Sequence, residues 1–141
     1  MLQSFDETAN PEQGPPRLAA LRKVMRHEGL AGYLVPRADV HQGEYVAPHD
    51  ARLEWLTGFT GSAGFCAVLH DAAGVFVDGR YRTQVKAQVA TDHFTPVPWP
   101  DTALHDWLRG ALPDGGVVAF DPWLHTVAGL RKLEAGLEGS G

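Results

Sequence analysis

Short apolar runs alternate with stretches of helical periodicity along this chain, and no other feature constrains its fold as much. The runs with the length and bounding turn residues of strands are 32–35, 65–69, 75–77 and 117–120. The spacing of apolar residues predicts helices near 16–28, 51–57, 81–89, 102–111 and 130–137. Strands and helices that alternate in this way form a sheet with helices packed on its faces.

One hairpin interrupts the alternation. The strand from Phe65 to Leu69 is followed, after a turn at 71–74, by the strand from Val75 to Val77, and two strands so close in sequence pair with each other. Residues 94–97 form a weaker strand, which its prolines confine to a sheet edge. The predicted fold is therefore α/β, with a mixed central sheet that contains one hairpin.

Several residues are predicted to mark helix ends. Gly29 follows the first helix, at a position where a left-handed residue is favoured. Asp50 and Asp101 each precede a helical segment, and an aspartate there can accept a hydrogen bond from the first free backbone amides. Asp78, before the third helix, is available for the same role. We therefore expect aspartate caps at three of the helix starts.

Composition excludes several classes of protein. The formal net charge is −5 and the basic residues are scattered, which disfavours a nucleic-acid partner. The apolar runs are too short to span a membrane, and the N-terminus lacks the apolar core of a secretory signal. We therefore expect a cytoplasmic protein with no membrane partner. The single cysteine, Cys66, lies in an apolar run and is predicted to be a core residue rather than a reactive thiol.

The chain divides into three predicted segments. Its 141 residues suffice for one domain. Residues 1–15 are polar and contain proline and glycine, which indicates a flexible lead-in. Residues 16–137 carry the strands and helices of the domain, and 138–141, which end in Gly-Ser-Gly, indicate the start of a linker.

The segment from 37 to 49 is polar and aromatic without a regular period, and is predicted to be a loop. Asp39, His41, Glu44 and Tyr45 lie close together in it. Three of these residue types bind divalent metals, but metal sites usually draw ligands from several elements. A loop that is hydrogen-bonded internally through Asp39 and Glu44 is therefore the favoured interpretation.

Two further motifs lie downstream of this loop. The glycines Gly58, Gly61 and Gly64 follow a helix and precede a strand, which is the reverse of a phosphate-binding loop, so they indicate turns. Residues 78–81, Asp-Gly-Arg-Tyr, form a corner between a strand and a helix. Its arginine, Arg80, could face a carboxylate of a substrate or of another domain, and the sequence leaves this open.

The order of these motifs resembles a known family. The string YLVPRADVHQGEYVAPHDARLEWLTGFTGSAG, then the hairpin, then VDGRY, is similar to the N-terminal domain of Xaa-Pro aminopeptidases in the creatinase/prolidase superfamily, metallopeptidase family M24. Trp99-Pro100, the Asp-Trp-Leu sequence at 106–108 and Val118–Pro122 fit as well. The resemblance covers about residues 17–137 and is greatest to the three-domain cytosolic type.

This resemblance implies a three-layer α/β/α domain of ribonuclease H-like topology. It also implies that the reaction, removal of an N-terminal residue that precedes proline, takes place in a C-terminal pita-bread domain. Two divalent metal ions, usually manganese, are bound there by residues that have no counterparts in this chain. We therefore expect this chain to hold no catalytic residue, metal or cofactor, and to be inactive as a peptidase by itself.

In such enzymes the N-terminal domain helps to wall the entrance to the active site and contributes to dimer contacts. By resemblance, the residues that would face the catalytic domain or the substrate's path are Asp39, His41, Glu44, Tyr45, Arg52, Arg80 and Tyr81. The implied partners are the pita-bread domain, a second subunit in a homodimer, and proline-containing peptides. The leading hypothesis is a non-catalytic domain of a metal-dependent Xaa-Pro aminopeptidase.

Two alternatives remain. The first is a free-standing module that binds a small ligand or peptide in the loop from Arg37 to Arg52. The second is a small metal hydrolase built on Asp39, His41 and Glu44, which is disfavoured because all its ligands would come from one short segment.

Overall fold

A mixed five-stranded sheet forms the centre of the molecule. The computed structural model describes residues 10–43, 45–47 and 49–141. The strands are β1 (Gly32–Pro36), β2 (Phe65–Leu69), β3 (Ala73–Val77), β4 (Thr95–Pro98) and β5 (Val118–Phe120). Their order across the sheet is β4-β3-β2-β1-β5.

The strand directions confirm the predicted mixed sheet and its hairpin. Strands β2 and β3 pair antiparallel, as do β1 and β2, whereas β1 pairs parallel with β5 and β3 with β4. Strand β4 lies at an edge, as predicted, where Pro96 and Pro98 lack the amide hydrogens that a further strand would need. The turn of the hairpin is shorter than expected, because Ala73 and Gly74 already belong to β3.

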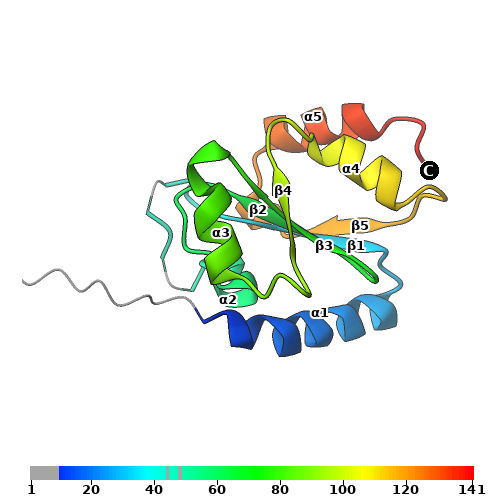
Figure 1. Ribbon diagram of the computed structural model, residues 1–141. Helices are drawn as coiled ribbons and strands as arrows, with labels where there is room; N and C mark the ends of the chain where they lie inside the picture. The colour runs from blue at the N-terminus through cyan, green and yellow to red at the C-terminus, as the bar shows by residue number, and fades with distance from the viewer. Residues whose placement is uncertain (1–9, 44, 48) are drawn as a thin grey trace, which may run out of the picture.

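Helices cover both faces of the sheet, so the domain has three layers (Figure 1). Helices α1 (Gly14–Glu28), α2 (Arg52–Thr57) and α3 (Arg82–Gln88) lie on one face. Helices α4 (Leu104–Ala111) and α5 (Val127–Leu137) lie on the other. Short 3-10 turns precede α1 (Pro11–Gln13), α3 (Gly79–Tyr81) and α5 (Pro122–Leu124). This arrangement confirms the α/β fold class.

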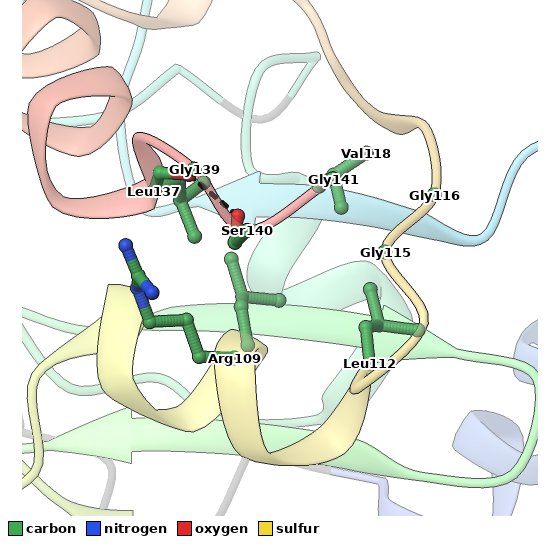
Figure 2. Close-up of a pocket in the computed structure, with 10 residues that line it drawn as sticks. Arg109, Leu112, Gly115, Gly116, Val118, Leu137, Gly139, Ser140 and Gly141 are labelled. Carbon is green, nitrogen blue, oxygen red and sulfur yellow. Dashed lines mark hydrogen bonds between the residues drawn. The ribbon is translucent and has the colours of Figure 1, made fainter.

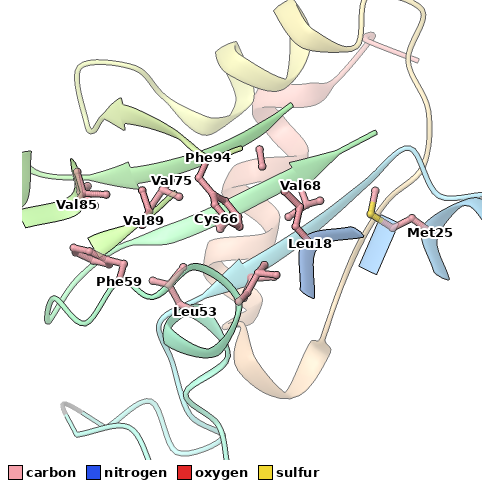
Figure 3. Packing of buried hydrophobic residues seen from close by; sticks show 14 residues of the cluster. Leu18, Met25, Leu53, Phe59, Cys66, Val68, Val75, Val85, Val89 and Phe94 are labelled. Carbon is pink, nitrogen blue, oxygen red and sulfur yellow. The ribbon is translucent and has the colours of Figure 1, made fainter. Parts of the chain in front are cut away.

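Residues that alternate along the strands build two hydrophobic cores. On the α1–α3 side, Cys66 and Val68 of β2 and Val75 of β3 pack against Leu18 of α1 and Val85 of α3 (Figure 3). We call this the first core. Cys66 is fully buried, and burial raises the pKa of its thiol to about 12, so it is a packing residue as predicted.

The second core lies under α4 and α5. Leu34, Ala67, Phe76 and Val97 are its buried members, and Trp107 of α4 packs on them. The rings of Phe76 and Trp107 meet edge to face with centroids 5.4 Å apart. Every strand from β1 to β3 therefore contributes to both cores through the period-2 alternation of its side chains.

The helix ends agree with the prediction at two places and differ at two. Gly29 ends α1 in the left-handed conformation (φ 70°), as expected. Asp78 acts as a cap too, but of the 3-10 turn that precedes α3: its carboxylate accepts a hydrogen bond from the amide of Arg80, and Tyr81 holds the cap position of α3 itself. Asp50 does not cap α2, because Ala51 holds the cap position and the Asp50 carboxylate accepts from the Val40 amide instead. Asp50 and Asp78 are the first two of the three aspartates that the sequence predicted as helix caps.

Asp101 was also expected to cap a helix, and this prediction is wrong. The cap position of α4 is Ala103, with no side-chain hydrogen bond, and the Asp101 carboxylate pairs with Arg82 at 3.1 Å. Near the N-terminus, residues 1–9 of the predicted lead-in lie outside the described residues, and α1 begins at Gly14, slightly before the expected start at Pro16. In the part of the chain that the structure describes, the helices are too short or too polar to cross a membrane.

Candidate functional site

The carboxyl ends of four strands meet at one end of the sheet. Strands β1, β3, β4 and β5 all run in the same direction, and antiparallel β2 begins where they end. The segments that emerge there are 37–51, 59–64, 78–81, 99–103 and 121–126. We call this surface the carboxyl-end face; its loop at 37–51 and helix α3 lie at the left of Figure 1. Five of the residues selected from the sequence lie in these segments within the described chain: Asp39, His41, Tyr45, Arg80 and Tyr81.

Asp39 organises the loop that follows β1. Its side chain is only 7% exposed, and Oδ1 accepts hydrogen bonds from the amides of His41 at 2.9 Å and Gly43 at 3.0 Å. The bond from Gly43, followed by that from His41, lowers the pKa of the Asp39 carboxyl. The carboxylate is therefore used to fold the loop, which confirms the internally hydrogen-bonded interpretation for this residue.

The other residues of the loop are arranged around Asp39. His41 and Tyr45 are exposed, Tyr45 at 86%. Gln42 has a left-handed backbone (φ 55°), and its Nε2 donates to the carbonyl oxygens of Asp39 and Leu124, each at 3.1 Å. Glu44 was selected from the sequence too, but it lies outside the described residues. The loop is thus attached to the segment after β5, although these residues are far apart in the chain.

Arg52 makes a second connection between the same two regions. Its guanidinium donates from Nη1 to the Asp121 carboxylate, forming an ion pair. Asp121 also accepts a hydrogen bond from the amide of Trp123 at 2.9 Å, and this bond together with Arg52 lowers the pKa of its carboxyl. Arg52 therefore holds α2 against the end of β5 rather than extending free into solvent.

The corner at 78–81 is held by its own side chains. The Asp78 carboxylate accepts from the amide of Arg80 at 2.9 Å and from its Nη2 at 2.8 Å. The Arg80 side chain lowers the pKa of the Asp78 carboxyl, and the pKa of Arg80 rises in turn. The guanidinium also lies over the Tyr81 ring, 5.1 Å from its centroid. Arg80 is therefore already engaged within the domain.

Tyr81 ties this corner to the glycine loop. Its hydroxyl accepts from the amide of Ser62 at 3.0 Å and is bonded to the Ser62 hydroxyl, and these bonds lower the pKa of Tyr81. The Tyr81 ring packs edge to face on Phe59, with centroids 5.5 Å apart. The Gly64 carbonyl accepts from the amide of Arg37 at 3.1 Å. The glycine loop thus joins the corner to the beginning of the loop at 37–51.

The glycines act as turn residues, as the sequence indicated. Gly58 and Gly64 have φ values of 86° and 155°, which side chains rarely allow. At Gly61, an added Cβ would lie 2.2 Å from the ring of Phe59. The loop at 59–64 is therefore shaped by its packing against Phe59. Its described residues show no feature of a phosphate-binding loop.

Three aromatic side chains on the carboxyl-end face are exposed to solvent. Tyr45 is joined there by Trp123, 74% exposed, and Trp99, 41% exposed and edge-on to Phe65 at 6.1 Å. The site residues selected from the sequence did not include Trp99, Trp123 or Asp121. A signal was present for two of them, since the Trp99-Pro100 pair and the Asp121-Pro122 pair belong to the motifs that carry the family resemblance, whereas Trp123 lies outside those motifs.

The described residues do not fit the two-metal site that the resemblance implies for the whole enzyme. Among the described residues, no group of three His, Cys, Asp or Glu side chains is placed to hold a metal ion. The Asp39 carboxylate accepts hydrogen bonds from the backbone amides of its own loop. No reaction step can therefore be derived through a metal held by the described residues.

Cavities also lie away from the strand ends. One of about 400 Å³ lies between α4, β5 and the C-terminal residues (Figure 2). Arg109 is one of the residues that line it and donates to the carbonyls of Gly136 and Glu138 at 2.8 and 2.6 Å. Another, of about 430 Å³, lies between α1 and α2 beside the exposed ring of Trp55. Neither contains a residue from the carboxyl-end loops.

Fold and motifs together define an α/β domain of the kind found at the N-terminus of creatinase- and prolidase-type enzymes, and sequence comparison agrees. The model of the Creatinase/Prolidase N-terminal domain family matches residues 17–140. This chain belongs to that family. It is 38% identical over 123 residues to the Homo sapiens protein named Xaa-Pro aminopeptidase 2. This match covers 87% of this chain and 18% of that protein. It is also 38% identical over 137 residues to the probable Xaa-Pro aminopeptidase P of Talaromyces stipitatus, covering 96% of this chain and 20% of that protein.

Solved structures show the same domain. The X-prolyl aminopeptidase of Caenorhabditis elegans, described as a cytosolic enzyme with a di-nuclear active site, superimposes with a TM-score of 0.83 at 31% identity, over 91% of this chain and 23% of that one. The N-terminal domain of the peptidase PepQ from Mycobacterium tuberculosis gives a TM-score of 0.63 at 29% identity, over 89% of this chain and 87% of that one. This chain thus spans about a fifth of the full-length relatives it matches.

Proposed function

We propose that this chain is the non-catalytic N-terminal domain of a cytoplasmic, metal-dependent Xaa-Pro aminopeptidase, and that its carboxyl-end face borders the entrance to the active site. The metal ions, manganese in this proposal, and the reacting groups belong to a catalytic domain that continues the polypeptide. Homodimer contacts and access for proline-containing peptides are the roles assigned to this domain. The names of its relatives support the assignment to a peptidase.

The observation that carries the proposal is the set of exposed aromatic rings on a surface whose segments are joined by hydrogen bonds. Tyr45, Trp99 and Trp123 all lie on the carboxyl-end face, and such side chains are enriched where proteins bind one another. Asp39 folds the loop that bears Tyr45, and the ion pair of Arg52 with Asp121 holds the segment that bears Trp123. The amide of Trp99 donates to the carbonyl of Val77 at 2.9 Å. A surface that is already ordered loses little entropy when a partner domain or peptide binds to it.

The experiment compares substitutions in the polypeptide that joins this domain to its catalytic domain. Tyr45→Ala and Trp123→Ala should each lower kcat/KM for an Xaa-Pro peptide by roughly fivefold or more, the effect of removing an interface aromatic. Trp55→Ala is the matched control, because Trp55 is also an exposed tryptophan but lies on α2 near α1. Equal activity in all three variants would exclude this face from substrate access and from subunit contacts.

One observation favours the alternative of a free-standing binding module. The loop from Arg37 to Arg52 contributes Arg37, Ala38 and Gln42 to a cavity of about 330 Å³. Calorimetric titration of the 141-residue chain with proline-containing peptides separates the two functions. Saturable micromolar binding supports the module, whereas the aminopeptidase-domain proposal expects neither such binding nor hydrolysis with added manganese.

A further inference from the structure

The cavity between α1 and α2 carries an inference that goes beyond the proposed function. Its volume of about 430 Å³ lies in the range of small-ligand sites. Most of its lining is apolar and includes Ala20, Leu21 and Val24 of α1, Tyr33 and Val35 of β1, and Trp55 of α2. Val24 and Trp55 are exposed, so the cavity is open to molecules in solution.

Arg17 places a positive charge beside these apolar side chains. Its Nη1 donates to the carbonyl of Trp55 at 2.5 Å, and its guanidinium lies over the Trp55 ring, 4.7 Å from the ring centroid. These contacts join α1 to α2 and restrain the guanidinium at the cavity that Arg17 lines. A guanidinium has five N–H donors, and among the described residues only one of them is used in a hydrogen bond. Because the side chain is partly exposed, the other donors remain available to a ligand.

The charges at the cavity favour a ligand with a single negative charge. Arg17 and Arg52 are the charged residues of its lining. Arg52 is neutralised by its ion pair with Asp121, whereas Arg17 has no acidic partner within the described ranges. One positive charge therefore remains. It matches a carboxylate, which a guanidinium can bind through two parallel hydrogen bonds, better than a phosphate group with its nearly two negative charges.

We propose that this cavity binds a small aromatic carboxylic acid as its anion, with the ring against the apolar lining and the carboxylate paired with the guanidinium of Arg17. Tyr33 and Trp55 supply aromatic surface for the ring. Since Trp55 already restrains Arg17, little of the binding energy is spent on ordering this side chain. An assay of peptide cleavage contains no such acid, so Trp55→Ala remains a control for the proposed function.

The test titrates the 141-residue chain with 2-naphthoate and with 2-naphthamide, which has the same shape and no charge. The indole N–H NMR signal of Trp55, identified by its absence in Trp55→Phe, reports binding at this cavity. At low salt we expect 2-naphthoate to bind about fivefold more tightly than the amide, the upper effect of one partly exposed ion pair. High salt should reduce this preference. Equal binding of the two probes, or a failure of 2-naphthoate to saturate the chain, would overturn the proposal.

Substitutions on α1 separate the charge from the apolar lining. Arg17→Gln should bind both probes equally, whereas Arg17→Lys, which keeps the charge, should still prefer 2-naphthoate. Arg26→Gln is the matched control, because Arg26 is an exposed cation of α1 outside the lining of the cavity, and it should behave as the parent chain does. Ala20→Phe fills the cavity from an exposed position and should bind neither probe.

The proposal is also overturned if Arg17→Gln keeps the preference for 2-naphthoate or if Ala20→Phe binds it as the parent does. Should Arg17→Gln not fold, Ala20→Phe and the salt dependence of the parent chain decide. Two other occupants give different results. A Trp55 signal that changes with protein concentration in the absence of a probe would assign the cavity to a second copy of this chain. Tighter binding of N-acetylphenylalanine than of 2-naphthoate would assign it to the C-terminus of a polypeptide, and either result would overturn the proposal.

Discussion

Single carboxylates at the carboxyl-end face act through the backbone amides that surround them. Asp39 accepts from Gly43 and His41, and Asp121 from Trp123, and these bonds lower the pKa of both carboxyls. Each of these two carboxyls therefore ionises more readily in the folded chain than in the unfolded one. Their contribution to stability is present above the unfolded pKa of about 4 and is lost as pH falls through the lower folded pKa.

Asp39→Asn tests this linkage. At neutral pH the variant should melt at a lower temperature than the parent, because the amide oxygen is a weaker acceptor than a carboxylate. The difference should shrink as pH falls from about 4 through the lower folded pKa of Asp39, because the unfolded chain binds the proton first and the folded carboxylate only below its own pKa. Circular dichroism melts between pH 7 and pH 2 measure it, with Asp114→Asn at an exposed carboxylate as the control. A difference that stays constant over this range would contradict the assigned role of Asp39.

Two glycines of the site region provide a matched comparison of backbone strain. Gly58 has φ 86°, and a Cβ there would lie 2.5 Å from the carbonyl oxygen of Gln88. Gly58→Ala should therefore lower the free energy of unfolding by about 2 kcal/mol or more. At Gly79 an added Cβ meets no atom within 4 Å, so Gly79→Ala should change stability by less than about 0.5 kcal/mol. Urea denaturation compares them, and equal losses would show that the conformation at Gly58 is not constrained.

At the scale of elements, the same substitution should have opposite effects in the two helices over the second core. Gly110 of α4 is exposed, and a Cβ there meets nothing within 4 Å, so Gly110→Ala should stabilise the domain by about 0.5–1 kcal/mol through helix propensity. In α5, a Cβ on Gly136 would lie 2.5 Å from the ring of His105. Gly136→Ala should therefore destabilise the packing of α4 on α5. Thermal unfolding of both variants gives the signs, and two stabilised variants would show that the helices can move apart without cost.

For the helices and strands, the sequence predicted the features that depend on the local spacing of apolar residues. The strand at 65–69 and the helix containing Leu18 and Met25 follow from apolar spacing, which burial on one face imposes directly. Two helix caps were wrong for a different reason. Asp50 and Asp101 found non-local partners, the Val40 amide and the Arg82 guanidinium, and these were brought near only by the tertiary fold. A capping rule that considers only neighbouring residues cannot take such distant hydrogen-bond partners into account.

The predictions for the candidate site also divide into local features, which the sequence indicated, and non-local contacts, which it did not. The hydrogen-bonded turn of Asp39 is local and was predicted, because its donors His41 and Gly43 follow within a few residues. The pairing of Arg52 with Asp121 joins residues 69 positions apart, and no spacing rule indicates it. Exposure was equally hidden: an aromatic such as Trp123 is indistinguishable in sequence from a core residue such as Phe76. Motif resemblance was the information that pointed to this end of the sheet.

At the scale of the whole molecule, the two cores are one structural unit. Neighbouring residues of β2 and β3 point to opposite faces, so Val75 belongs to the first core and Phe76 to the second. If either core is lost, the same strands lose the packing on one of their two faces. We therefore expect a single cooperative unfolding transition rather than separate melting of the two helical layers.

A pair of core substitutions measures this coupling. Val68→Ala in the first core and Phe76→Leu in the second should each lower the free energy of unfolding by about 1–3 kcal/mol. Tryptophan fluorescence, to which Trp107 over Phe76 contributes, and far-ultraviolet circular dichroism should report the same midpoint in urea for the parent and both variants. If Phe76→Leu shifted the fluorescence midpoint and left the circular dichroism midpoint unchanged, the layer of α4 and α5 would unfold independently. The fixed geometry of the carboxyl-end face, which joins 37–51 to 121–126, would then depend on the weaker layer alone.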